Sequence, residues 1–589
     1  MIKGLLKRFL IWQRNHIGAH TFIILASILV GIVSALAAVA LKTFVHLMHR
    51  IPDYFFALSN TRIWYIILPL CGIILTIVFV KIFLKGKLEK GLGSILFSIS
   101  RGSSKVEKSK MYSHVVTSGL TIGLGGSAGL EAPIVITGSA IGSNIGKMLN
   151  LGYKERTLLL ACGAASGIAA VFNSPIAGLV FAIEVLLTDV SIGMFIPLLI
   201  STASAIIVSK FLYSGQLFYL ITNQWYYHAI PFYIILGVLC GLVSVYMTRV
   251  TLFMEDFFEK RKGIYSKAII GGLILGILIF LFPPLFGEGY TTITSLFHGD
   301  YTALLGKSLF SSFTSSPLVL IVVTIAIVLV KVIATSITLG SGGNGGIFAP
   351  SLFTGSLTGF GFAYIINTVG ISTLHVSNFV AVGMAGIMSG VVHAPLTAIF
   401  LIAEITGGYV LFVPLMIVSA LSFFISRYFE PYTIYTKKLA QKGHLFTADK
   451  DTNILMQLQL HELIEKEFVP LLVTAKFRDV IDAFTTSQRN VFPVVDKDNN
   501  FVGIIDLINI KELMFKPEVY DQMTVFDVTT TEVLTIDNNE NVISAMRKFE
   551  SSGRWNLPVI DEGKYVGVIS WSNILSYYRR ILKRSASFF

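Results

Sequence analysis

The sequence contains few charged residues and few cysteines. Each of these shortages argues against certain classes of protein. Only 14% of its 589 residues are charged and 54% are hydrophobic, whereas soluble proteins carry charge on about a quarter of their residues. The three cysteines, Cys71, Cys162 and Cys240, all lie in apolar runs. Their spacing indicates neither a disulfide framework nor a metal site. The composition therefore argues against an ordinary soluble protein.

Charge is also unevenly distributed. Residues 1–445 contain 30 basic and 14 acidic residues, a net charge of +16, while residues 446–589 contain 16 and 20, a net charge of −4. The chain thus consists of an apolar, basic body and a polar, mildly acidic tail. The net charge of +12 does not indicate nucleic-acid binding, because the excess lies on the apolar body, where Lys and Arg flank membrane spans.

Long stretches of the body contain no charged side chain. Several are long enough to cross a membrane as a helix, which takes about 20 residues. They are Thr21–Leu41, Ile63–Val80, Ala229–Thr248, Ala268–Gly287 and Ser308–Val330. A further stretch, Val332–Ala403, is uncharged over 72 residues but rich in Gly. Irregular backbone inside a membrane requires shielding by protein or water, so we expect several short or broken helices there.

The first apolar run follows a basic segment that carries Lys3, Lys7, Arg8 and Arg14. The run is too long for a signal peptide and lacks a small-residue cleavage site. We therefore expect a retained first span. The positive-inside bias places residues 1–17 in the cytoplasm.

The body contains two related halves, at about 18–210 and 228–445. Gly125–Pro133 aligns with Gly342–Pro350, with five identical residues in nine at an offset of 217. At an offset of 220, Ala161–Ala165 aligns with Ala381–Ala385, Pro175 with Pro395, and Glu184 with Glu404. Repeated halves with broken helices are typical of transporters, whose binding sites lie between the repeats.

Both halves place a Gly cluster before a Pro and an apolar run. Gly lets the chain turn sharply into a helix, and Pro suits the first helical turn. The free N–H groups and the positive end of the helix dipole favour an anion. Two such helix starts could face one anion site without a full positive charge. Close helix packing is the alternative role for these glycines, but their duplication favours the anion site.

Glu131 lies within the first of these motifs. It is the only acidic residue between Glu107 and Glu155, and it precedes Pro133 by two positions. It could simply cap a helix dipole. An acid inside a membrane indicates function by default, and we expect its carboxylate to occupy the anion site, blocking it when ionised and opening it when protonated.

The tail contains a second duplication. Phe492–Asp506 matches Leu557–Ser570, and each copy reads as two short strands around a turn, followed by a helix. The sequence predicts a soluble α/β module in two copies, at 446–515 and 516–589.

Together these motifs resemble the CLC chloride channel and transporter family, from about residue 18 to the end. Gly129–Pro133 is similar to its G-[KR]-E-G-P segment, Gly346–Pro350 to G-x-F-x-P, Phe172–Gly178 to F-N-x-P-x-A-G, and Ile434–Leu439 to its last membrane helix. The tail resembles a pair of cystathionine-β-synthase-type (CBS) modules.

The resemblance implies an all-α polytopic membrane protein with an inverted-repeat bundle of tilted and broken helices, followed by a cytoplasmic α/β CBS pair. It implies transport of chloride or a similar anion by a homodimer in the plasma or inner membrane, with both termini cytoplasmic, and no enzyme activity, metal or cofactor in the body. Glu131 would be the gate. The anion contacts would be Gly129, Leu130, Ile347, Phe348 and Tyr435, with Ser94 as a further candidate and Tyr432 as the alternative tyrosine.

Several positions depart from the family pattern. Leu92 stands where a polar anion donor is expected, and Leu130 replaces a basic residue at the outer mouth. Val185 stands where proton-coupled members carry an inner glutamate. Its neighbour Glu184 points about 100° away on a helix. Val185 favours channel-like conduction, with chloride/proton exchange as the alternative.

A membrane-bound sensor or enzyme is a remote alternative, because the sequence contains no H-E-x-x-H and no G-x-S-x-G.

The CBS pair leaves two roles open. Family members that bind an adenine nucleotide often place an Asp after the last strand, and Asn509 and Asn573 stand at those positions here. The pair either binds a nucleotide with these side chains or serves as a structural dimerisation tail.

Overall fold

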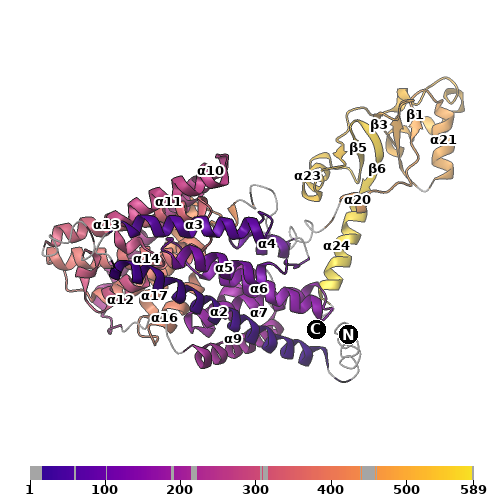
Figure 1. The fold of residues 1–589 in the computed structure, drawn as a ribbon. Coiled ribbons are helices and arrows are strands. Elements are labelled where there is room, and N and C mark those ends of the chain that lie inside the picture. The colour runs from indigo at the N-terminus through magenta and orange to yellow at the C-terminus, as the bar shows by residue number, and fades with distance from the viewer. Residues whose placement is uncertain are drawn as a thin grey trace. The chain divides into compact units, whose positions relative to one another are not determined.

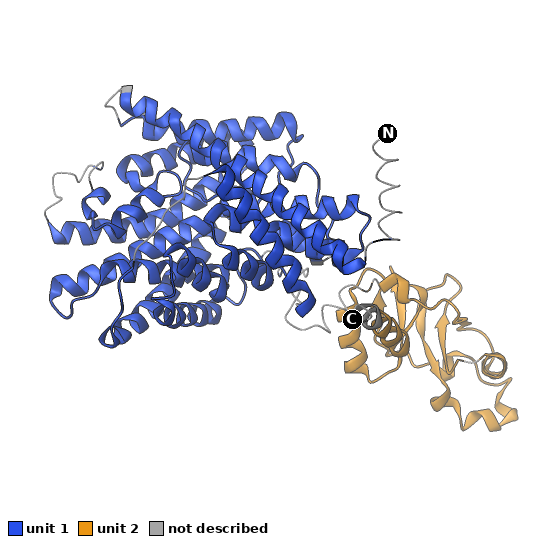
Figure 2. Cartoon of the chain, turned by 90° about the horizontal axis from the view of Figure 1, so that it is seen from below, with its two compact units in different colours: residues 1–445 blue, residues 446–589 orange. Residues whose placement is uncertain are grey.

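The chain forms two compact units, residues 1–445 and 446–589 (Figure 2). The computed structural model describes residues 16, 18–58, 62–100, 103–187, 191–213, 222–305, 308, 316–437, 440, 458, 460–487 and 489–586. Within this part of the chain, nine helices, all in unit 1, are long and apolar enough to cross a membrane.

All the secondary-structure elements described in the first half of unit 1 are helices (Figure 1). Its elements are α2 (Ala19–Leu58), α3 (Trp64–Phe83), α4 (Gly93–Ser100), α5 (Lys110–Gly123), α6 (Glu131–Met148), α7 (Tyr153–Phe172), α8 (Pro175–Phe181), the π-helical turn η1 (Ala182–Leu186) and α9 (Ile192–Leu212). Several of these are short, as expected for broken helices.

The second half repeats this order. Its elements are η2 (Tyr227–Ala229), α10 (Ile230–Lys260), α11 (Ile264–Leu281), η3 (Pro283–Leu285), α12 (Tyr290–Phe297), η4 (Tyr301–Leu304), α13 (Pro317–Gly340), α14 (Phe348–Val369), α15 (Val376–Val392), α16 (Pro395–Ile405) and α17 (Phe412–Phe429). The uncharged stretch Val332–Ala403 thus forms parts of four helices, α13 to α16, as its glycines predicted.

Matching helices of the two halves pack in the same way. α6 crosses α7 where a Cβ on Gly138 would come within 2.1 Å of the Gly163 carbonyl oxygen, and α14 crosses α15 where a Cβ on Gly355 would come within 2.3 Å of the Gly383 carbonyl oxygen. No side chain fits at either crossing, so these glycines do allow close helix packing. Figure 1 shows α6 and α14 extending toward opposite ends of unit 1, the arrangement of an inverted repeat.

Each half also caps a helix of the other with a carboxylate. The Glu184 carboxylate accepts hydrogen bonds from the backbone N–H groups of Leu396 (3.1 Å) and Thr397 (2.8 Å), at the start of α16. The Glu404 carboxylate accepts them from Ile176 (3.0 Å) and Ala177 (2.9 Å), at the start of α8. An anionic acceptor at a helix N-terminus satisfies free donors and complements the dipole. The aligned glutamates thus join the two halves.

Unit 2 contains two three-stranded sheets of the same topology. Its elements are α20 (Leu460–Leu463), β1 (Leu471–Leu472), α21 (Phe477–Thr486), β2 (Val491–Val495), β3 (Phe501–Asp506), α22 (Leu507–Ile510), η6 (Leu513–Phe515), η7 (Pro517–Val519), η8 (Phe526–Val528), β4 (Ile536–Asp537), α23 (Val542–Ser552), β5 (Asn556–Asp561), β6 (Lys564–Ser570) and α24 (Trp571–Ala586). In each sheet the first strand pairs parallel with the second, and the second antiparallel with the third.

The two copies in unit 2 exchange their leading segments. The backbone of Glu465, which precedes the first sheet, forms two hydrogen bonds with Val568 of β6. The backbone of Thr530, which precedes the second sheet, forms two with Ile504 of β3. Leu463 accordingly packs in the core of the second copy. Because each copy completes the other, they form one folding unit.

We expect Glu404→Ala to lower the thermal stability of the purified protein. The change leaves two backbone donors at the start of α8 without their anionic acceptor, at a cost of about 2 kcal/mol. For a unit of this size, this cost corresponds to a fall in melting temperature of about 2 °C. The measurement is the melting temperature in detergent, followed by size exclusion. Glu107→Ala, which removes an exposed carboxylate, is the matched control. Equal melting temperatures for the two variants would contradict the capping role.

Candidate anion site and the cavity beside it

The two Gly-rich motifs meet each other in the middle of unit 1. The Gly129 N–H donates to the Gly346 carbonyl oxygen at 2.8 Å, and the Gly346 N–H donates to the Gly129 carbonyl oxygen at 2.7 Å. Immediately after this antiparallel bridge the chain enters α6 at Glu131 and α14 at Phe348. The two helix N-termini are therefore held side by side by backbone hydrogen bonds.

Two threonines fix the approach to the bridge. Thr121 of α5 accepts the N–H of Gly126 with its carbonyl oxygen (2.8 Å) and the N–H of Asn344, in the other half, with its hydroxyl (3.0 Å). Thr338 of α13 accepts the N–H of Gly343 with its carbonyl oxygen (3.0 Å) and the N–H of Ser127, in the first half, with its hydroxyl (3.2 Å). Each Gly-rich loop is thus held by a threonine from each half.

The helix starts beside the bridge leave backbone donors available. Within the described residues, the N–H groups of Leu130, Ile347 and Phe348 donate to no backbone carbonyl. The first N–H groups of a helix have no partner inside the helix, and the dipole adds positive potential at this end. The structure therefore brings the predicted anion contacts Gly129, Leu130, Ile347 and Phe348 to one place.

The carboxylate of Glu131 lies at this place. The residue is 1% exposed. Its Oε1 accepts a hydrogen bond from the Tyr290 hydroxyl at 2.5 Å, and its Oε2 accepts one from the Ala349 N–H at 3.3 Å. Gly129 makes room for it, because a Cβ there would lie 2.1 Å from Oε2. The side chain thus crosses from the start of α6 to the start of α14.

Tyr290 was not predicted from the sequence. It begins α12, in the second half, and lies 159 positions from Glu131. No local motif relates the two residues. The available signal was Glu288, two positions earlier, an acid at the end of a long uncharged stretch.

A cavity of about 820 Å³ lies on the far side of Tyr290. It is lined by the end of α2, the start of α3 and the segment around α12. Its polar and aromatic lining includes His49, Asp53, Tyr65, Glu288, Tyr290 and Ser295. Glu131 does not line it, whereas Tyr290 both lines the cavity and donates its hydroxyl to the Glu131 carboxylate.

Tyr435, Ser94 and Leu92 lie toward the opposite face of unit 1. α3 runs from the cavity at Tyr65 across about 30 Å, and α4 follows it. A Cβ on Gly93, which begins α4, would lie 3.2 Å from the Tyr435 carbonyl oxygen. Tyr435 packs against the main core of unit 1.

The two candidates at the start of α4 differ in their surroundings. Leu92 is buried and packs in the main core. Ser94 Oγ accepts a hydrogen bond from Lys110 Nζ at 3.1 Å, and the same ammonium pairs with Glu89 at 2.6 Å. The Ser94 hydroxyl thus keeps its own hydrogen to donate. Tyr432 is 43% exposed, away from the core against which Tyr435 packs.

Val185 lies in the π-helical turn η1 and packs against the main core. The neighbouring Glu184 uses its carboxylate to cap α16. Position 185 is where the family resemblance implies a glutamate in proton-coupled members. Neither Val185 nor Glu184 offers a free carboxylate there.

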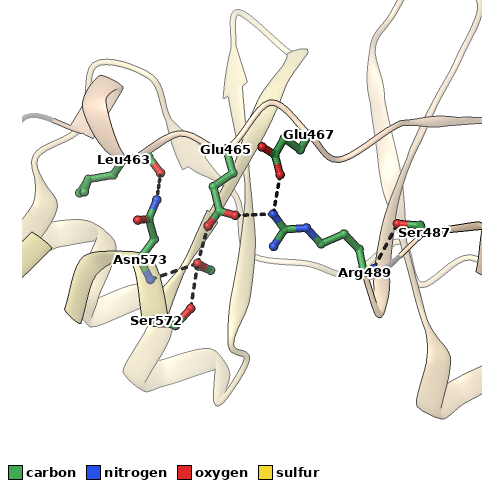
Figure 3. A network of polar contacts seen from close by, with 8 residues as sticks. Leu463, Glu465, Glu467, Ser487, Arg489, Ser572 and Asn573 are labelled. Carbon is green, nitrogen blue, oxygen red and sulfur yellow. Dashed lines mark hydrogen bonds and ion pairs between the residues drawn. The ribbon is translucent and has the colours of Figure 1, made fainter. Parts of the chain in front are cut away.

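In unit 2, Asn573 belongs to a polar network at one junction of the two copies (Figure 3). Its side-chain amide donates to the Leu463 carbonyl oxygen at 3.0 Å, and its backbone N–H donates to Ser570 Oγ at 3.2 Å. Ser570 bonds to Glu465, which pairs with Arg489 at 3.0 Å. These contacts hold the exchanged leading segment in place.

Asn509 lies at the equivalent junction on the other side. Its amide donates to the Thr530 hydroxyl at 3.3 Å, and Arg554 pairs with Asp506 nearby. Each junction thus carries an Asn, an Arg and a carboxylate.

These features define a polytopic membrane protein with two repeated helical halves, whose broken helices point their N-termini at a shared site, and with a tail of two exchanged α/β modules. A family model described as voltage gated chloride channel matches residues 77–427, and a CBS domain model matches residues 460–516 and 525–580. The first match covers more than half of the chain, which therefore belongs to the CLC family of anion channels and transporters. Members of this family are not enzymes.

Individual relatives include both kinds of transport protein. The chain is 27% identical over 549 residues to chloride channel protein CLC-f of Arabidopsis thaliana, covering 80% of this chain and 68% of that one. It is 30% identical over 335 residues to the H(+)/Cl(−) exchange transporter ClcA of Vibrio cholerae serotype O1, covering 54% and 66%.

Solved structures share the fold. A slow cyanobacterial Cl−/H+ antiporter superposes with a TM-score of 0.61 at 24% identity, over 71% of this chain and 97% of that one. A eukaryotic CLC transporter has a TM-score of 0.61 at 19% identity, over 94% and 97%.

We expect Tyr290→Phe to raise anion flux at neutral pH. The hydroxyl holds the Glu131 carboxylate in the site, and losing a hydrogen bond worth about 1.4 kcal/mol frees it roughly tenfold more often. The measurement is chloride efflux from liposomes that contain the purified protein. Tyr65→Phe, in the same cavity wall, is the control and leaves flux unchanged. A Tyr290→Phe flux equal to that of the control would show that the hydrogen bond does not restrain Glu131.

Proposed function

We propose that this protein conducts chloride, or a similar small anion, passively across the plasma or inner membrane, and that Glu131 is its gate. The observation that carries the proposal is the place of the Glu131 carboxylate. It lies against the N-terminus of α14 and accepts the Ala349 N–H, which is where backbone donors would receive an anion. An ionised Glu131 and a transported anion then compete for one site.

The chemistry of the site suits rapid transport. Backbone donors at Leu130, Ile347 and Phe348 bind an anion through partial charges, so a dehydrated anion is stabilised without the strong attraction of a lysine or arginine. The Tyr435 hydroxyl would contact the same anion from the other face, and Ser94 would serve the inner entrance. When Glu131 is protonated or swings away, the N–H groups become available and the path opens.

Channel-like conduction is favoured over proton exchange by the residues below the gate. Val185 carries no proton, and the Glu184 carboxylate is engaged by two N–H groups and the Thr397 hydroxyl. Chloride/proton exchange on the same fold is the second candidate, and the exchange transporters among the relatives support it. As the family resemblance implies, we propose a homodimer with both termini in the cytoplasm.

Glu131→Gln should conduct anions at a rate that no longer depends on pH on the cavity side. Glutamine keeps the size of the side chain but carries no exchangeable charge, so the gate stays in its neutral form. The measurement is chloride flux in liposomes between pH 4.5 and 8. The wild-type flux rises as pH falls. A variant with the wild-type pH response would remove Glu131 from the gate.

The same liposomes separate the two transport mechanisms. A chloride gradient is imposed, and the internal pH is recorded together with chloride flux. Passive conduction moves chloride without protons once the voltage is clamped by a potassium ionophore. Proton movement against its own gradient, in fixed proportion to chloride, would establish exchange instead.

We also propose that the CBS pair binds an adenine nucleotide at the junctions that contain Asn509 and Asn573. The residues fit such a ligand: Arg489 and Arg554 suit phosphate groups, while the asparagines and the carboxylates of Glu465 and Asp506 suit ribose hydroxyls. The ion pairs Arg489–Glu465 and Arg554–Asp506 would have to rearrange for phosphate to bind.

Isothermal titration of the full-length protein with ATP and with AMP tests this binding. We expect heat with one of the nucleotides and at least about tenfold weaker binding after Arg489→Ala or Arg554→Ala, since a charge-assisted contact is worth about 1.5–3 kcal/mol. Arg478→Ala, which removes a solvent-exposed ion pair with Asp521, is the control. No heat at millimolar nucleotide would indicate a structural tail.

A further inference from the structure

A second carboxylate lies close to Glu131, on the cavity side. One oxygen of Glu288, Oε1, is buried and has no hydrogen-bond partner among the described residues. Glu288 also lines the cavity, two positions before Tyr290. Burying a carboxylate oxygen without a partner is costly, so such a group in a membrane protein calls for a functional reason.

A buried cation faces this carboxylate. Lys331 of α13 is 0% exposed. Its ammonium donates to the carbonyl oxygens of Gly287 (3.0 Å) and Leu285 (3.4 Å) and lies 4.7 Å from the centre of the Phe353 ring. The charges of Lys331 and of Glu131 both act on the Glu288 carboxylate.

The charges of this cluster do not balance without a proton. Glu131 and Glu288 together contribute two negative charges when ionised, and Lys331 contributes one positive charge. A buried net charge is unfavourable, so the cluster is neutral when its two carboxylates share one proton. Two nearby carboxylates of this kind titrate as a coupled pair.

The cavity borders part of this cluster. Glu288 and Tyr290 line the cavity and Glu131 does not, while the Tyr290 hydroxyl donates to Glu131 Oε1. A cavity of about 820 Å³ whose lining includes several polar side chains has ample room for water. Tyr290 therefore connects the wall of the cavity to the Glu131 carboxylate.

We propose that Glu288 is a second proton-binding residue of the gate, which takes protons from the cavity and exchanges them with Glu131 through the Tyr290 hydroxyl. This inference rests on the proposed gating role of Glu131. In the transfer, the protonated Glu288 releases its proton to cavity water, the Tyr290 oxygen accepts a proton from that water, and the tyrosine passes its original hydroxyl proton to Glu131 Oε1. Glu288 ends ionised, Glu131 ends neutral, and Tyr290 is unchanged.

Other titratable groups face the same space. His49 and Asp53 come from α2, and Tyr65 comes from α3. They lie at the cavity wall, whereas Lys331 is buried and does not line the cavity. We assign the proton exchange to Glu288 because its buried carboxylate oxygen has no partner among the described residues and because it lies two positions before Tyr290, which donates to Glu131.

The test is the pH dependence of chloride flux in liposomes for variants of the full-length protein. Glu288→Gln removes a negative charge beside Glu131, so Glu131 takes up a proton less readily, and the pH of half-maximal flux falls by about one unit. Lys331→Met removes a positive charge and moves this pH upward by a similar amount. Glu288→Asp keeps the charge and keeps the wild-type midpoint.

Two cavity-wall variants serve as controls. Ser295→Ala leaves the midpoint unchanged, and Asp53→Asn shifts it by less than half of the Glu288→Gln shift. If Lys331→Met does not yield a folded dimer or monomer by size exclusion, the Glu288→Gln and Glu288→Asp pair decides alone. A midpoint for Glu288→Gln within about 0.3 unit of the wild type, or an equal shift for Glu288→Asp, overturns the proposal.

Combination with Glu131→Gln separates the two proposals. If Glu131→Gln abolishes the pH response, Glu288→Gln alone shifts the midpoint, and the double variant behaves like Glu131→Gln, both stand. If Glu131→Gln abolishes the response but Glu288→Gln alone leaves the wild-type midpoint, the gate stands and the role of Glu288 fails. If Glu131→Gln retains the full response, the gate itself fails, whatever Glu288→Gln does.

Discussion

The pair of backbone hydrogen bonds between Gly129 and Gly346 is the constraint on which the site depends. It fixes where α6 and α14 begin, and with them the direction of the free N–H groups at both helix starts. Only glycine fits at Gly129, because a Cβ would displace the Glu131 carboxylate. Positive potential at this point therefore comes from backbone geometry, which side-chain motion cannot move.

Neither half of unit 1 is complete without the other. Thr121 and Thr338 each bind the loop of the opposite half, and Glu184 and Glu404 each cap its helix. The two threonines are 217 positions apart and the two glutamates 220, which are the offsets between the halves in the sequence. The same interactions therefore occur once in each half. The same logic recurs in unit 2, where the leading segment of each copy pairs with the other copy. In both units, the repeats are therefore interdependent.

The parts of the site that could be predicted from sequence are those encoded by local pattern. The Gly-Pro helix starts and their offset predicted paired N-termini, and an isolated acid singled out Glu131. Tyr290, Glu288 and Lys331 were missed because their roles arise from tertiary contacts between α6, α12 and α13, which no spacing in the chain reveals. The exchange of leading segments in unit 2 was missed for the same reason, since Glu465 of the first copy pairs with Val568 of the second copy.

The structure also explains how the proposed anion site, which contains no lysine or arginine, coexists with a buried lysine a short distance away. The Lys331 ammonium donates to the carbonyl oxygens of Leu285, at the end of η3, and of Gly287, two residues beyond it, and it lies over the Phe353 ring. Two of its three N–H donors are therefore engaged by the backbone. Its field is still felt by Glu288, and through Glu288 by Glu131. A cation placed in this way biases the protonation of the carboxylates without offering an anion a place to bind tightly. In the proposed mechanism, gating charge and anion binding are thereby separated in space, which would allow the anion site to remain weak and the gate to remain sensitive to protons.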